Sequence, residues 1–193
     1  MNSPQPACHS FSLVEFLGRL DDRFALLTKG KRTAAPRQQT MRATLDWSHD
    51  LLSPEERILF RRLAVFRSAF DLESAIQCCT CSELTSTGVI EGICGLTAKS
   101  LLLADVSGEI TLFRLLKSTR AYAAEQLSLA GEAAQVNHRH AQQIRDMLVQ
   151  GAAEWQTLDA ETWREKYRRL IDDIRAAIDW SLRPDGDHAL GLR

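Results

Sequence analysis

One helix face is the clearest feature in the pattern of hydrophobic and polar positions along this chain. Leu59, Phe60, Leu63 and Phe66 follow one another at three- and four-residue spacing. Side chains with this spacing line up on one side of an α-helix. Burying one of them stabilises a fold by about 1.5–3 kcal/mol. We therefore expect this helix to bury one face, with the elements on either side of it packed there.

The same segment carries signals for where the helix begins. Ser53 can cap the N-terminus, Pro54 suits the first helical position, and Glu56 completes a capping box with Ser53. Arg61 and Arg62 stand late in the helix, where positive charge suits the helix dipole. The sequence thus predicts a helix that begins at Pro54.

Apolar stripes predict further helices before and after this one. In the helix expected near residues 88–100, Gly92 and Gly95 each cost about 1 kcal/mol of helix propensity, so a close approach between helices is their expected use. In chain order, these helices are predicted at 12–20, from Thr40 to Leu52, from the cap Asp71 to Cys79, from about Gly88 to Ser100 with a stripe at Val89, Ile90, Ile93 and Leu96, from the cap Ser118 to Ala130, at 140–155, from Ala160 to Leu182, and from His188 onward.

Two alternating apolar runs, Leu101–Val106 and Ile110–Leu116, predict β-strands. Ser107, Gly108 and Glu109 separate them and form a good hairpin signal. Short helices followed by one hairpin are typical of a winged-helix domain. We therefore predict a mainly α fold that contains a winged-helix domain.

Charge and composition set few limits on function. The 193 residues carry a net charge of -1 and are 45% hydrophobic, so no global field draws the chain to nucleic acid or an anionic membrane. The pattern contains neither an apolar run long enough to span a bilayer nor a signal core near Met1. We expect a cytoplasmic chain, with no membrane partner.

The five cysteines are an odd number, which favours reduced thiols over a disulfide framework. Cys78, Cys79 and Cys81 cluster and provide one C-x-x-C, but a structural zinc site wants a second such pair. Thiols that pack in the core or lie at the surface are the favoured interpretation. A metal or redox role is the alternative.

The sequence shows no arrangement typical of an active site, so we do not expect an enzyme. His138 and His140 are two residues apart, point away from each other on a helix and cannot form a ligand pair; we expect them at the surface or the edge of the core. Asp172 and Asp173 are expected on the solvated face of an amphipathic helix.

A basic segment stands out between Thr28 and Arg42. It carries no acidic residue, and Gly30 and Pro36 should interrupt regular structure. A solvated linker is the simpler interpretation, and a loop that meets phosphates or an acidic surface is the alternative. Its positive charges are Lys29, Lys31, Arg32, Arg37 and Arg42.

Several blocks of the sequence resemble, in the same order, blocks of bacterial predicted ATPases of the STAND class. These are signal-transduction ATPases with numerous domains, often fused to a DNA-binding transcriptional regulator domain. The blocks that carry the resemblance are Leu20–Arg57, Leu59–Phe66, Val89–Leu102, Phe113–Leu127 and Ile171–Leu182.

The resemblance implies a fold class and a division into domains. The fold would be mainly α, a winged-helix domain with one β-hairpin followed by antiparallel helices of a repeat-like superhelical region. The implied domains are 1–11 as a disordered tail, 12–41 as the end of a helical domain and the basic linker, 42–130 as the winged-helix domain, and 131–193 as the start of a TPR-like helical repeat region.

The resemblance also implies a non-catalytic regulatory role. In the family, the winged helix packs on the nucleotide-binding domain and helps to hold the resting, ADP-bound state, while helical repeats sense a protein or small-molecule effector. This sequence has no phosphate-binding loop. We therefore expect a fragment without a cofactor of its own, with ATP or ADP and Mg²⁺ bound only in an intact parent protein.

Arg37, Arg42 and Lys117 are the residues expected to contact that nucleotide-binding domain. Related proteins often place a His-Asp pair, whose His approaches the ADP β-phosphate, where this chain has Leu116 and Lys117. The His contact is therefore not carried over.

A DNA-binding winged-helix transcription factor is the alternative function. The helix that would enter the groove, about Gly88 to Ser100, offers Lys99 at its far end and Glu91 near its start. Base readout wants Arg, Lys, Asn or Gln near the N-terminal end of such a helix. Direct DNA binding is therefore not expected.

Overall fold

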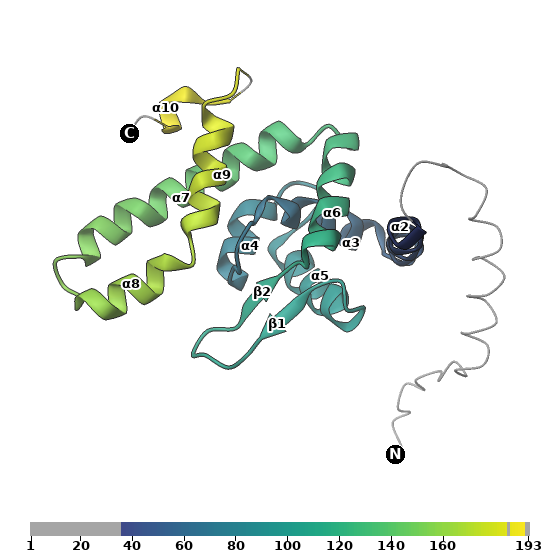
Figure 1. Ribbon diagram of the computed structural model, residues 1–193, viewed down its shortest axis with the longest axis horizontal. Helices are drawn as coiled ribbons and strands as arrows, with labels where there is room; N and C mark the ends of the chain where they lie inside the picture. The colour runs from purple at the N-terminus through teal and green to yellow at the C-terminus, as the bar shows by residue number, and fades with distance from the viewer. Residues whose placement is uncertain (1–35, 185, 192–193) are drawn as a thin grey trace, which may run out of the picture. The chain divides into compact units, whose positions relative to one another are not determined.

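The computed structural model describes residues 36–184 and 186–191 (Figure 1). The chain divides into two compact units, 1–47 and 48–193. The elements are α2 Pro36–Asp50, α3 Pro54–Arg62, the 3-10 helix η1 Leu63–Val65, α4 Leu72–Cys79, α5 Ser86–Ala98, β1 Leu103–Asp105, β2 Leu112–Arg114, α6 Lys117–Leu129, α7 Ala133–Glu154, α8 Ala160–Arg168, α9 Ile171–Ser181 and α10 His188–Gly191.

The predicted helix at 12–20 and most of the basic segment lie outside the described residues. In the first unit, the described part is the stretch of α2 from Pro36 to Trp47. The helix begins four residues earlier than Thr40, because proline lacks only an N–H that the first helical turn leaves unbonded in any case. The prediction that Pro36 interrupts regular structure was wrong.

The cap and buried face of α3 are as predicted. Ser53 Oγ accepts a hydrogen bond from Glu56 N at 3.2 Å, and Glu56 Oε2 accepts one from Ser53 N at 2.8 Å. Leu59 and Phe60 on α3, and Leu63 on η1, are at most 1% exposed. This face forms the centre of the second unit, because α3 packs on both α5 and α6, and η1 packs on α6.

Helix α5 approaches α3 closely through its glycines. A Cβ at Gly92 would lie 2.6 Å from Leu59 Cδ2, and one at Gly95 would meet Glu56 Oε1. The expected close approach is therefore confirmed. Ile90, predicted on the buried stripe, is exposed instead, because the glycine side of the helix faces α3.

The predicted hairpin is present but shorter than the two apolar runs. β1 and β2 are antiparallel, with Ala104 opposite Phe113. Phe70, just before α4, exchanges two backbone hydrogen bonds with Phe113, of 2.9 and 2.7 Å. The hairpin is thereby anchored to the helical core beside α4.

Helix α6 begins without the predicted cap. Its N-cap residue is Leu116, and no side chain caps the helix, so Ser118 does not have the predicted role. The predicted end at Gly131 is confirmed, because Gly131 has a φ of +71°, which favours glycine.

The last part of the chain is helical and packs on the winged-helix elements through α4 and α7. Helix α8 runs back beside α7, and α9 packs across α7 (Figure 1). The prediction of a single helix from Ala160 to Leu182 was wrong, because α8 ends at Arg168 and a separate helix, α9, begins at Ile171. Arg169, within the break between them, and Asp173, after it, bind different winged-helix residues, and the local sequence pattern does not indicate these distant contacts.

We expect Gly92→Ala to destabilise the fold. Overpacking a core costs about 1–3 kcal/mol, which outweighs the gain of about 1 kcal/mol in helix propensity. Urea unfolding of the full chain should therefore show a net loss of up to about 2 kcal/mol. Gly108→Ala is the control, because its Cβ would meet nothing nearer than Ile110 O at 3.8 Å. A Gly92→Ala variant that is more stable than wild type by the full gain in helix propensity, about 1 kcal/mol, would contradict the close approach.

Candidate functional site

The exposed face of α5 is where a winged helix would read a DNA groove. Thr85 caps the helix, with its Oγ1 accepting from Gly88 N at 3.2 Å. No Arg, Lys, Asn or Gln lies within α5. Lys99, just beyond its end, pairs with Glu56 at 2.5 Å. The exposed residues of α5 are Ser86, Thr87, Ile90, Glu91, Cys94 and Ala98.

The tip of the wing is apolar and acidic. Val106 is 74% exposed and Ile110 is 60% exposed. Asp105 Oδ1 accepts from the hydroxyl and the backbone N of Ser107, and these bonds hold the pKa of Asp105 below its ordinary value. Glu109 is also exposed at the turn. Negative charge at the wing tip disfavours contact with phosphates.

A groove of about 530 Å³ runs beside α5, along the start of α3. Leu51, exposed in the α2–α3 connection, forms an apolar part of its wall, and Glu55, Glu56 and Glu91 supply carboxylates. Face, wing tip and groove together offer mainly apolar and acidic side chains, since Lys99 in the groove wall is paired with Glu56, and such a surface suits a contact with protein.

The residues predicted to contact a nucleotide-binding domain fall in both units. Arg37 and Arg42 belong to α2 in the first unit, and Lys117 is the first residue of α6 in the second. Arg42 and Lys117 are exposed. Their role stays a prediction.

A buried carboxylate joins the winged-helix elements to the last helices. Asp173 Oδ1 accepts from Arg67 N at 2.7 Å and from His140 Nε2 at 3.1 Å, and Asp173 Oδ2 accepts from Ser68 N at 3.0 Å. Burial by itself raises the pKa of Asp173, but the bonds from His140 and from the two amides outweigh it, so the pKa lies below its ordinary value. The expectation that Asp173 lies on a solvated face was wrong.

His140 is buried with this carboxylate, whereas His138 is only half-buried and pairs with Asp187 at 3.2 Å. The two histidines thus have different partners, and His140 lies deeper than the predicted surface or edge of the core. Its ring meets Phe66 edge-on, with centroids 5.3 Å apart. Nothing in the local sequence marks His140 as the partner of Asp173, because the two are 33 positions apart.

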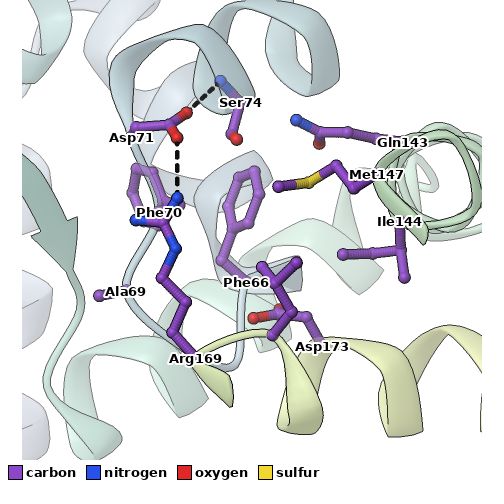
Figure 2. Close-up of a pocket in the computed structure, with 11 residues that line it drawn as sticks. Phe66, Ala69, Phe70, Asp71, Ser74, Gln143, Ile144, Met147, Arg169 and Asp173 are labelled. Carbon is purple, nitrogen blue, oxygen red and sulfur yellow. Dashed lines mark hydrogen bonds and ion pairs between the residues drawn. The ribbon is translucent and has the colours of Figure 1, made fainter. Parts of the chain in front are cut away.

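Figure 2 shows the neighbouring part of this joint. Asp71 caps α4 through Ser74 N at 2.8 Å and also accepts from Arg169 Nη2 at 3.3 Å. Phe66 and Phe70 stack beside it, with ring centroids 4.3 Å apart. The joint therefore combines an ion pair, a helix cap and an aromatic stack.

A second buried polar centre surrounds Arg62. Its guanidinium donates to Glu132 Oε2 at 2.7 Å, to Cys79 O at 2.9 Å and to Cys81 Sγ at 2.8 Å. Burial by itself raises the pKa of Glu132, but Arg61 and Arg62 outweigh it and the pKa is lowered. Helix periodicity places Arg62 late in α3 but cannot show that it is buried.

The cysteine cluster is built around the same guanidinium. Cys78 and Cys79 are fully buried, which confirms that they pack as core thiols. Burial raises the pKa of Cys81, but the bond from Arg62 and the amides of the following turn outweigh it, so its pKa is lowered. In the part of the chain that the structure describes, no three His, Cys, Asp or Glu residues are grouped to hold a metal ion.

Known proteins with similar sequences are consistent with the winged-helix fold. Residues 52–128 match the family model described as a winged helix-turn-helix domain. Over 175 residues the chain is 42% identical to "Putative HTH-type transcriptional regulator Rv0890c" of Mycobacterium tuberculosis, which covers 89% of this chain and 19% of that protein. Over 138 residues it is 37% identical to "Uncharacterized protein Rv0894" of the same organism, which covers 70% of this chain and 35% of that protein.

The chain therefore spans about a fifth of the length of one relative and about a third of the other. No solved structure matches it. The family match and the fold agree on a winged-helix domain in residues 52–128 of the chain. Among the described residues, no helix has the length and apolar character needed to cross a membrane.

We expect Asp173→Asn to weaken the joint, whereas Asp172→Asn should not. An amide loses the charge that strengthens hydrogen bonds from the two backbone amides, each worth roughly 1.5–3 kcal/mol. Asp172, its exposed neighbour, pairs only with Arg175, also at the surface. Urea unfolding should therefore separate the two variants by about 2 kcal/mol at pH 7, and equal stability would contradict this role of Asp173.

Acid should distinguish the same two variants. Because the folded pKa of Asp173 lies below that of an unfolded aspartate, about 3.9, its contribution is complete above that value and is lost as the pH falls through the folded pKa. Asp173→Asn should therefore lose less stability than wild type as the pH falls below about 4.

Proposed function

We propose that this chain is a non-enzymatic regulatory part of a transcriptional regulator, whose winged helix makes a protein contact in place of reading DNA. The exposed face of α5 carries this proposal. It contains no Arg, Lys, Asn or Gln, which make the commonest bidentate contacts to bases, and it places Glu91 beside Ile90. The acidic wing tip points the same way, because it would face phosphates in the usual docking geometry.

The partner in this proposal is the nucleotide-binding domain of a STAND-class signal-transduction ATPase. The ordered blocks described above support it, among them Val89–Leu102, which contains most of α5 and reaches the turn before β1. The last helices would relay effector binding from TPR-like repeats to the winged helix. The contacts of Asp173 and Arg169 give such a relay a physical route, because they tie α9 and its connection to the segment between η1 and α4.

A DNA-binding winged-helix transcription factor is the second candidate. The matched family model and the name of the 42% identical relative favour it. The charge pattern of α5 and the wing opposes it. The two candidates differ in their electrostatics, so salt dependence separates them.

We expect no tight binding of the full chain to duplex DNA. At physiological salt, fluorescence anisotropy with a mixed-sequence duplex should give a Kd no tighter than the weak end of non-specific binding, about 10⁻⁴ M. A double variant, Glu91→Lys with Glu109→Lys, should bind more tightly because it reverses two exposed charges, one on α5 and one at the wing tip. Tight wild-type binding that weakens steeply with salt would establish the DNA-binding candidate instead.

The nucleotide-domain contact can be tested in a chimera that joins this chain to a nucleotide-binding domain of the same ATPase class. We expect the triple variant Arg37→Glu, Arg42→Glu, Lys117→Glu to release bound ADP about tenfold faster, because reversed charges repel the partner surface. Arg145→Glu is the control, since Arg145 is an exposed residue of α7 that pairs with its neighbour Asp146. Unchanged ADP release in the triple variant would show that this contact is wrong.

A further inference from the structure

A small cavity lies within the joint of Figure 2, between α4, α7 and the residues that follow α8. Its volume of about 10 Å³ is close to the least that holds one water molecule. Phe66, Ile144 and Met147 form apolar parts of its wall, and Ser74 and Gln143 form a polar part. It is therefore a polar spot inside a mostly apolar contact.

Two residues that line this cavity have a buried polar atom without a hydrogen-bond partner among the described residues: Gln143 has the acceptor Oε1 and Arg169 the donor Nε. Gln143 is only 8% exposed. A buried acceptor without a donor is costly, and such groups are rare in folded proteins. Figure 2 shows the Gln143 side chain reaching from α7 toward the side of the cavity on which Ser74 of α4 lies.

The surroundings restrict what can occupy the site. The occupant has to donate to Gln143 Oε1, and a hydroxyl such as that of Ser74 can both donate and accept. An anion is disfavoured because the carboxyl groups of Asp71 and Asp173 line the same cavity, and the one guanidinium in the lining, that of Arg169, already pairs with Asp71. The volume excludes anything much larger than water.

We propose that this cavity binds one water molecule, which donates to Gln143 Oε1 and bridges it to the hydroxyl of Ser74. The water links α4 of the winged helix to α7 of the last helices. It completes the hydrogen bonding of a buried group that the protein alone leaves unsatisfied. The joint is thus partly hydrated, and the fit between its two sides depends on a solvent molecule.

The first test is a crystal structure of the full chain at about 1.5 Å resolution. We expect a density peak of water size within hydrogen-bonding distance of Gln143 Oε1 and Ser74 Oγ. A direct bond between the two side chains, or a larger group in the cavity, would overturn the proposal. So would a cavity with no density.

The second test is a double-mutant cycle with Gln143→Met and Ser74→Ala, followed by urea unfolding. If one water bridges the two groups, removing either side chain removes the same bridge, so the effects on the unfolding constant should fall short of the product of the single effects by about fivefold. Pairing Ser74→Ala with Gln142→Met, at the half-buried neighbour of Gln143, should be multiplicative within about twofold. Multiplicative effects in both cycles would contradict the bridge.

Discussion

The carboxylate of Asp173 is buried when the chain folds. It is stable in the interior because three donors from distant parts of the sequence bind it. Two are the backbone amides of Arg67 and Ser68, and the third is His140 Nε2. Moving a charge out of water costs several kcal/mol, which only well-placed hydrogen bonds offset. These hydrogen bonds have a defined direction and length, whereas apolar packing tolerates small shifts between surfaces. They therefore fix the position of α9 against the end of η1 more precisely than apolar packing alone would.

Arg62 is a second buried charge that is stabilised by partners from distant parts of the sequence. Glu132, in the turn between α6 and α7, receives both Arg61 and Arg62, while Arg62 also donates to Cys79 O at the end of α4. One guanidinium thus fastens the end of α4 and the start of α7 to α3. Together with Asp173 it makes α7 a shared element, held near its start by one polar centre and at His140 by the other.

The sequence predicted what depends on neighbours along the chain and missed what depends on distant partners. The cap at Ser53, the buried face of α3 and the glycines of α5 were readable because spacing and capping are local rules. The break after Arg168 was not, because residues 160–182 keep one helical period, whereas Arg169 and Asp173 bind residues that are distant in the sequence. The prediction that Asp173 is solvated was wrong for the same reason. An acid on an amphipathic helix is usually solvated, and only the fold brings this one to the amides of residues 67 and 68.

The exposed face of α5 is poor in basic side chains, although the fold is one that often reads DNA. The fold needs only the buried side of α5, where Gly92 admits Leu59. Its outer side is free to vary, so topology by itself says little about what that side binds. A protein that reads DNA would carry Arg or Asn on this outer side. Here the outer side carries the carboxylate of Glu91 and the apolar side chain of Ile90. Such a pair gains little from a phosphate backbone but is an ordinary component of a protein interface, which has apolar contacts at its centre and charges at its rim.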